Sequence, residues 1–241
     1  MSLDLFRKRF QKKFDVVVIA HRGACKEAPE NTLQAFEQAV DAGAEMIEFD
    51  VHKTIDNQVV VIHDRTTGRT SDRDIDVHTS TLEQVREASL ENGLQIPTLE
   101  EVFIQFKGKL YFQIEVLETE MAPEVIGLID KYNVHDQCLI SSFLDRTLPT
   151  YKNSKKKIML AYIGHEPNSL FRKAGKHQLD GIHPQYEIVT PEFVSKSRSK
   201  NLFVNAWSVD SQKDWEYLIE CGVDGIITNY PRELIKFLKS G

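Results

Sequence analysis

The sequence predicts an α/β protein built as a (β/α)8 TIM barrel, with an extra antiparallel hairpin strand after the second barrel strand. Three observations support this prediction. Nine short apolar runs, rich in β-branched residues, recur along the 241 residues and are typical of strands buried on both faces. Segments with helical periodicity separate these runs. One connection between two runs is too short for a parallel crossover. An open, doubly wound sheet is the alternative fold.

The expected strands follow one another along the whole chain. They occupy residues 16–20, 45–51, 59–63, 110–116, 138–143, 157–163, 179–184, 202–209 and 223–228. The clearest helices cover residues 31–43, 98–108 and 211–222, where apolar residues recur at helical spacing and a glycine ends each segment. No Ser/Gly-rich linker separates these elements. We therefore expect one barrel domain over residues 1–241, of which residues 1–14 form an N-terminal extension.

The second and third strands are expected to form a hairpin. Only a few polar residues around Asp56 and Asn57 separate them, whereas a parallel crossover needs a dozen or more residues. Eight strands then remain for the barrel. If Asp56 and Asn57 form a two-residue turn, Asp50 lies opposite His63, within one residue of register. In either register, a histidine lies beside the acidic residues at the end of the second barrel strand.

The composition is that of an ordinary globular protein, with 41% hydrophobic and 27% charged residues. The net charge of −6 does not favour nucleic acid as a partner, and we interpret the basic clusters at 7–13 and 152–157 as solvated surface. No apolar run has the length of a membrane span or the position of a signal peptide. Three widely separated cysteines form neither a zinc motif nor a disulfide framework. We expect a cytoplasmic protein without stable membrane insertion.

Three acidic residues lie inside predicted strands. Glu48 and Asp50 are two residues apart and therefore point to the same face of one strand. Carboxylates that lie side by side inside a barrel repel one another and are costly to bury unless a cation neutralises them. Together with Glu115 they form an all-oxygen set suited to one divalent cation, Mg²⁺ or Ca²⁺, with Mn²⁺ as a further option. A salt-bridge network with Arg22 or a lysine is the alternative.

Two histidines and an arginine are expected at the same end of the barrel. His21 and Arg22 follow the first strand, and the hairpin brings His63 to the carboxylates. Side chains at the strand exits form the active sites of (β/α)8 barrels. Two such histidines can act as an acid–base pair near neutral pH, and the forked donors of an arginine match a phosphate. A barrel histidine that packs and bonds a backbone carbonyl is the ordinary alternative for each ring.

Ten short motifs follow one another between residues 17 and 235. They are HRG at 21–23, PENT at 29–32, EFDV at 48–51, VVVIHD at 59–64, RTS at 69–71, IPTLEEV at 96–102, QIEV at 113–116, SSF at 141–143, NAWSVD at 205–210 and GVDGIITNYP at 222–231. Each motif is weak alone, but the ordered set resembles the glycerophosphodiester phosphodiesterases. The resemblance implies a (β/α)8 barrel of the phospholipase-C-like type.

The resemblance also implies a reaction in glycerol and lipid metabolism. A small-molecule glycerophosphodiester would be hydrolysed to sn-glycerol 3-phosphate and an alcohol such as choline or ethanolamine, through a cyclic phosphate formed by the glycerol hydroxyl. The implied site residues are His21 and His63 as general acid and base, Glu48, Asp50 and Glu115 as ligands of one divalent cation, and Arg22, Phe143 and Trp207 as substrate contacts. The motifs specify neither the head group nor the oligomeric state.

Three positions depart from the family pattern. Leu117 stands where the family has a lysine, Gln113 where it often has asparagine, and Asn229 where it has the aspartate of a TDYP motif. We expect none of the three to touch the histidine pair or the metal ligands. The segment at 65–80 follows His63 where relatives carry an insertion, and its short, polar sequence predicts a fairly open site.

The remaining histidines are interpreted by their position. His183 follows a strand and is a candidate to line the pocket. Five others lie in turns or polar stretches and are expected at the surface: His52, His78, His135, His165 and His177.

Two further functions are compatible with the sequence. One is an enzyme of the same build with another substrate, such as a lysophospholipase D or a phosphodiester lyase. The other is a non-catalytic binding module, which the loss of a lysine at Leu117 suggests and which the intact histidine pair and carboxylates disfavour.

Overall fold

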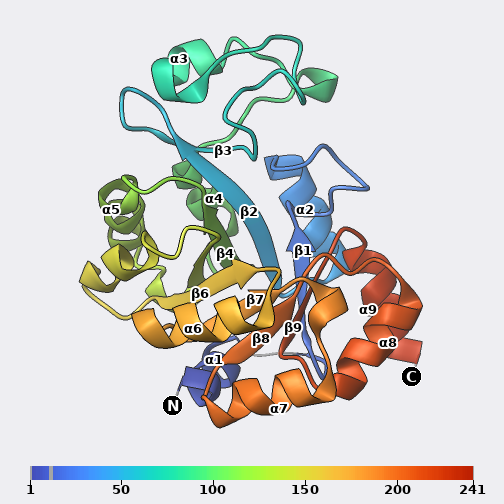
Figure 1. Cartoon of the computed structure of the whole chain (residues 1–241). Helices are drawn as coiled ribbons and strands as arrows, with labels where there is room; N and C mark the ends of the chain where they lie inside the picture. Colours follow the sequence, from blue (N-terminus) through green and yellow to red (C-terminus); the bar gives the residue numbers. More distant parts are fainter. Residues whose placement is uncertain (1, 11–12, 241) are drawn as a thin grey trace.

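The computed structural model describes residues 2–10 and 13–240. Within these residues, eight parallel strands close into a barrel because β1 pairs with both β9 and β2, and β3 lies outside the ring on β2 (Figure 1). The strands are β1 (Val17–His21), β2 (Met46–Lys53), β3 (Val59–Val61), β4 (Tyr111–Val116), β5 (Cys138–Ser142), β6 (Met159–Gly164), β7 (Gly181–Pro184), β8 (Phe203–Ala206) and β9 (Gly225–Thr228). Each expected run overlaps one of them, which confirms the predicted fold class.

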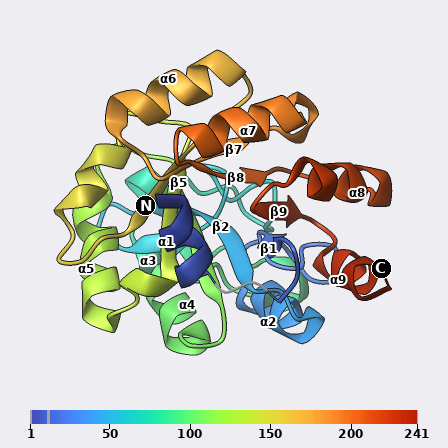
Figure 2. The ribbon, with the colours of Figure 1, turned by 90° about the horizontal axis from the view of Figure 1, so that it is seen from below.

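The described helices are α1 (Ser2–Arg9), α2 (Leu33–Ala42), α3 (Leu82–Val85), α4 (Leu99–Phe106), α5 (Ala122–Tyr132), α6 (Pro167–His177), α7 (Pro191–Ser199), α8 (Gln212–Cys221) and α9 (Pro231–Ser240). Helices α2 and α4 to α9 surround the strands as an outer layer, whereas α1 and α3 lie outside this layer (Figure 2). Helices α2, α4 and α8 are those that the periodicity predicts. Helix α2 begins where the Thr32 side chain accepts a hydrogen bond from Ala35 N and ends at Gly43, whose φ is 93°. No described helix has the length and apolar character to span a membrane.

Helix α1 closes the N-terminal end of the barrel (Figure 2). Phe6 and Phe10 are fully buried and belong to an apolar cluster inside the barrel that includes Met46 and Phe203. The rings of Phe6 and Phe203 stack with their centroids 4.2 Å apart. Of the extension expected at residues 1–14, residues 2–10 supply a base for the barrel, whereas residues 1, 11 and 12 lie outside the described residues. The cavity lies at the opposite, C-terminal end of the strands.

Strand β2 separates apolar from acidic side chains by its alternation. Ile47, Phe49 and Val51 belong to the main core between strands and helices, as their spacing predicts. Glu48 and Asp50 lie on the other face, inside the barrel. In the pairing with β4, Asp50 lies beside Glu115.

The hairpin exists, but its register differs by one residue from the two-residue turn. Val51 pairs with Val61, and Ile62 N donates to Asp50 O, so Ile62 rather than His63 lies opposite Asp50. The reason is a three-residue turn in which Thr54 N donates to Gln58 O. Asn57 adopts a left-handed φ of 62°, which asparagine tolerates well.

The segment after β3 forms a small lobe over residues 64–97, above the barrel in Figure 1. It contains α3 and the short 3-10 helices η1 (Val77–Thr79) and η2 (Glu91–Gly93). Its residues Val77, Val85, Leu90 and Ile96 form an apolar cluster together with Val60 and Ile62 of the hairpin. The lobe is thus longer and better packed than the short polar segment that the sequence suggests. The other 3-10 helices are η3 (His135–Gln137), η4 (Leu148–Asn153) and η5 (Tyr186–Ile188).

Candidate active site

One cavity of about 340 Å³ lies at the C-terminal end of the barrel strands, and all eight predicted site residues line it. They are His21, Arg22, Glu48, Asp50, His63, Glu115, Phe143 and Trp207. Its wall also includes Gln113, Ile163, His183, Ser208 and Ile227. Residues from strands far apart in sequence therefore meet in one place, as the barrel prediction requires.

The three carboxylates form a compact group. Each offers an oxygen, and these oxygens lie within 4.8 Å of one another. Glu48 and Asp50 are each only 2% exposed. Burial, followed by the charges of Asp50 and Glu115, raises the pKa of Glu48 well above its ordinary value. Burial and the charge of Asp50 raise the pKa of Glu115 to about 8.

This group fits a divalent cation on the chemistry of its donors. Three carboxylate oxygens without nitrogen or sulfur are the ligands that hard ions such as Mg²⁺ and Ca²⁺ prefer. Burial first, and repulsion between the charges second, raise the pKa values of Glu48 and Glu115, and a divalent cation would remove this cost.

Arg22 lies against the same group because the HRG turn bends sharply after β1. Arg22 and Gly23 have φ values of 55° and 81°. A Cβ on Gly23 would lie 2.8 Å from the backbone carbon of Ala35, so only glycine fits there. The turn places Arg22 Nε 3.3 Å from Asp50 Oδ2 and lets Arg22 N donate to Glu48 Oε2 at 3.1 Å.

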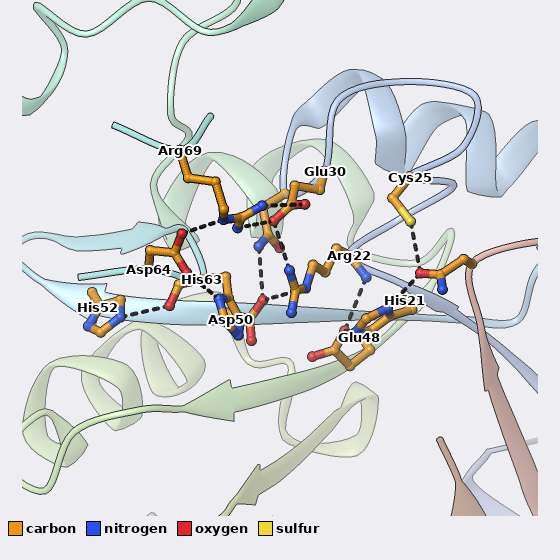
Figure 3. Close-up of polar contacts among 12 residues, drawn as sticks. His21, Arg22, Cys25, Glu30, Glu48, Asp50, His52, His63, Asp64 and Arg69 are labelled. Atoms are coloured by element: carbon orange, nitrogen blue, oxygen red, sulfur yellow. Dashed lines mark hydrogen bonds and ion pairs between the residues drawn. The ribbon is translucent and has the colours of Figure 1, made fainter. Parts of the chain in front are cut away.

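His21 is oriented by a residue whose role the sequence prediction misses. Its Nδ1 lies 2.7 Å from Asn229 Oδ1, which also accepts from the Cys25 thiol at 3.0 Å. Asn229 Nδ2 donates in turn to Asp210. His21 Nδ1 therefore carries the hydrogen, and its Nε2 points toward Glu48 Oε2 at 3.9 Å (Figure 3). The expectation that Asn229 does not touch the histidine pair is wrong, because β9 ends beside β1.

His63 has a charged partner instead. Its Nδ1 lies 2.6 Å from Asp64 Oδ1, so the ring donates from Nδ1 and leaves Nε2 for the cavity. Burial, followed by the charge of Arg22, lowers the pKa of His21. The two rings thus sit in different electrostatic surroundings.

A chain of ion pairs connects the carboxylates to His63 (Figure 3). Arg22 Nη1 donates to Glu30 Oε1 at 2.9 Å, and Arg69 donates to Glu30 at 2.6 Å and also to Asp64. Burial opposes ionisation of Glu30, but Arg69 and Arg22 lower its pKa to about 2. Glu30 lies in the PENT motif and Arg69 in the RTS motif, but neither residue has a role predicted from the sequence.

An aromatic rim forms one side of the cavity opening. The Phe143 ring lies 5.6 Å from Trp207 and 5.5 Å from His165, measured between centroids. Trp207 Nε1 donates to His183 O at 2.9 Å, which fixes the indole. His183 is fully buried and lines the cavity, and burial lowers its pKa to about 3, so the ring is neutral.

Two histidines expected at the surface are buried. His52 lies in β2, two residues beyond Asp50 on the same face, and is 5% exposed. His135 is 3% exposed, and its Nε2 bonds Asp130 Oδ1 at 2.6 Å. His78 and His177 are partly buried, and His165 is exposed, as predicted. Because side chains alternate along a strand, the spacing of two residues from Asp50 is the sequence signal that places His52 on the same inner face.

Comparisons with known proteins identify a family that this chain matches. A family model described as the glycerophosphoryl diester phosphodiesterase family matches residues 21–233. A glycerophosphodiester phosphodiesterase of Caldanaerobacter subterraneus subsp. tengcongensis is 35% identical, over 93% of this chain and 98% of its own.

Solved structures share the fold. The crystal structure of a glycerophosphodiester phosphodiesterase from Parabacteroides distasonis superposes with a TM-score of 0.83 at 26% identity, covering 95% of this chain and 99% of the other. An Oleispira antarctica phosphodiesterase, solved with the product sn-glycerol-3-phosphate, gives a TM-score of 0.83 at 23% identity, over 92% of this chain and 96% of the other.

Proposed function

Because the chain belongs to the glycerophosphoryl diester phosphodiesterase family, we propose that it hydrolyses glycerophosphodiesters to sn-glycerol 3-phosphate and an alcohol. The observation that carries the proposal is one cavity lined by three carboxylates, an arginine and two histidines that each present a ring nitrogen. An anionic diester needs positive charge at its phosphate and a proton donor and acceptor on its two sides.

Glu48, Asp50 and Glu115 would hold one divalent cation, Mg²⁺ or Ca²⁺ by their donor chemistry, with Mn²⁺ also compatible. When bound, the cation supplies positive charge to the phosphoryl oxygens. The guanidinium of Arg22 lies beside these carboxylates and would bind another phosphoryl oxygen. Its ion pair with Glu30 holds the side chain in place before substrate arrives.

The different partners of the two histidines support a division of roles. An imidazolium on His21 would face the neutral amide of Asn229 and lie near Arg22, whereas one on His63 would face the carboxylate of Asp64. We assign His21 as the first base and His63 as the first acid.

In the first step, His21 Nε2 takes the proton of the glycerol hydroxyl as its oxygen bonds to phosphorus. His63 Nε2 gives its proton to the departing alcohol oxygen, and a cyclic phosphate remains. In the second step, His63 takes a proton from the attacking water. His21 returns its proton to the glycerol oxygen as the ring opens, so both histidines end in their starting states.

The aromatic rim supports a position for the departing alcohol. Phe143 is 37% exposed, and its ring packs edge-on against Trp207. Aromatic faces of this kind bind methylated ammonium groups through cation–π attraction. The rim would therefore contact the head group, such as choline, while the polar side of the cavity binds the phosphate and glycerol.

The test is release of glycerol 3-phosphate from glycerophosphocholine, in EDTA and after Mg²⁺, Ca²⁺ or Mn²⁺ is restored. We expect turnover that EDTA abolishes and one of these ions restores. His21→Ala is expected to lower kcat by at least about 100-fold, because a general base is lost. His177→Gln is the matched control, since His177 bonds Asp145 away from the cavity.

Folded protein that releases no product with any of these ions would refute the substrate assignment. Activity on lysophosphatidylcholine instead would identify a lysophospholipase D. Binding of the diester without turnover, unaffected by His21→Ala, would identify a binding module.

A further inference from the structure

A second group of metal-ligating side chains lies just outside the cavity described above. His52 comes from β2, His78 from η1 in the lobe, and Glu118 from the loop after β4. His52 Nδ1 lies 2.8 Å from Glu118 Oε1, and His78 Nε2 lies 2.7 Å from the same oxygen. The two ring nitrogens are 3.1 Å apart. Three potential ligand atoms therefore converge on one point.

The outer contact of His52 fixes which of its nitrogens carries hydrogen. His52 Nε2 lies 3.1 Å from the backbone oxygen of His63 (Figure 3). A carbonyl oxygen only accepts, so Nε2 must be the donor. In the neutral ring Nδ1 is then bare, and its lone pair faces the carboxylate of Glu118. Metal-binding histidines are held in this way, with the second ring nitrogen donating to a carbonyl.

The carboxylate is also fixed from outside. Lys53 N donates to Glu118 Oε1 at 2.9 Å, which holds this oxygen in the group. A hydrogen on His78 Nε2 can be donated to His52 Nδ1 or to Glu118 Oε1, but not to both. The contact between His52 Nδ1 and Glu118 Oε1 then needs a positive charge between the two atoms, which either a second proton on His52 or a metal ion supplies.

We propose that His52, His78 and Glu118 bind a transition-metal ion of the Zn²⁺ class. Two imidazoles and one carboxylate suit Zn²⁺ and Co²⁺, whereas the all-oxygen group in the cavity suits Mg²⁺ or Ca²⁺. Tetrahedral coordination at about 2.0–2.1 Å separates ligand atoms by about 3.3 Å, so the group needs to open by only a few tenths of an ångström. The His78 side chain is 29% exposed, which leaves an entry path and a place for a water ligand.

The position of the site indicates what the ion does. His52 and Glu118 belong to the barrel, whereas His78 belongs to the lobe over residues 64–97. A bound ion would join η1 to the barrel. His52 also bonds the backbone of His63, so the same ion would fix the segment that carries this cavity histidine. We therefore assign it a structural role.

The experiment is a titration of chelator-treated protein with Co²⁺ in excess Mg²⁺, followed by visible absorption and by the amount of metal bound. We expect one Co²⁺ per chain with the absorption of a low-coordinate nitrogen and oxygen site. His78→Gln and Glu118→Gln are expected to weaken binding by at least about 100-fold, as each removes a ligand. Both residues are partly exposed, so these variants should fold.

Two controls separate this site from its neighbours. Glu115→Gln alters the carboxylate group in the cavity and is expected to keep the Co²⁺ signal. His177→Gln removes another histidine–carboxylate pair and should also keep it. The proposal is wrong if Co²⁺ does not bind in excess Mg²⁺, or if His78→Gln binds it as well as the parent protein does. Because the readout is metal binding, the result does not depend on the reaction proposed above.

Discussion

Replacing Glu115 with glutamine is expected to stabilise the metal-free protein while it removes activity. Burial and the charge of Asp50 raise the pKa of Glu115 from 4.5 to about 8. Between these pH values the native state keeps a proton that the unfolded state has lost, so stability falls as pH rises. Each unit costs about 1.4 kcal/mol, which gives about 3 kcal/mol at pH 7 and about 5 kcal/mol above pH 8. These energies are upper limits because Glu115 partly faces a solvent-filled cavity.

The measurement is urea unfolding in EDTA at pH 6, 7 and 8. The advantage of Glu115→Gln over the parent protein should grow across this range by up to about 3 kcal/mol. Glu100→Gln is the control: hydrogen bonds from Lys131 and Tyr132 lower the pKa of Glu100, so it is ionised in both states throughout. Its effect should not vary with pH.

Added Mg²⁺ should make the parent protein more stable than Glu115→Gln. The parent protein gains the stability that follows from ligand binding, whereas Glu115→Gln has lost a ligand and gains little. Turnover of the variant should fall by at least about 100-fold. A variant that is less stable than the parent in EDTA at pH 8, or a difference that is constant from pH 6 to 8, would refute the reasoning.

Three other substitutions test individual contacts of the site. Asn229→Asp should raise the pKa of His21 by stabilising its imidazolium, and the limb of the kcat/KM profile governed by His21 should move up by about one pH unit; an unchanged profile contradicts this. Arg69→Gln breaks the link to Asp64 and should lower kcat/KM roughly tenfold, as expected for a lost charged hydrogen bond; unaltered kinetics would mean that the link is dispensable. Trp207→Leu should raise the KM for choline diesters roughly threefold to tenfold, with a smaller change for an uncharged head group; equal changes for both would exclude a cation–π contact.

The barrel was predictable because its strands are strongly patterned. Runs such as residues 16–20 are apolar throughout, and this is the pattern of parallel strands covered by helices. The hairpin followed from the length of one connection. The register of the hairpin could not be predicted from this length, because a single left-handed φ at Asn57 decides between a two-residue and a three-residue turn. Such a choice depends on local hydrogen bonds that the spacing of apolar residues does not reveal.

The site residues that lie on strands could be found from spacing alone. Glu48 and Asp50 share a face by alternation, and Glu115 is a carboxylate inside an apolar strand, which the structure places beside Asp50. Asn229 and Arg69 could not be placed in this way. Asn229 reaches His21 because the last strand closes the ring beside the first. Arg69 reaches the site because the lobe packs on Val60 and Ile62 of the hairpin, and the Arg69 side chain pairs with Glu30.

The inner face of β2 explains how one strand can serve both stability and chemistry. Its side chains pass from Met46 in the apolar base, through Glu48 and Asp50 in the cavity, to His52 near the lobe. Helix α1 covers this apolar base at the N-terminal end of the barrel. The polar groups outward of Met46 are costly to bury without a cation or a hydrogen-bond partner. Strand residues that lower stability in this way are expected where function requires them. Both proposed metal sites take a ligand from this face of β2.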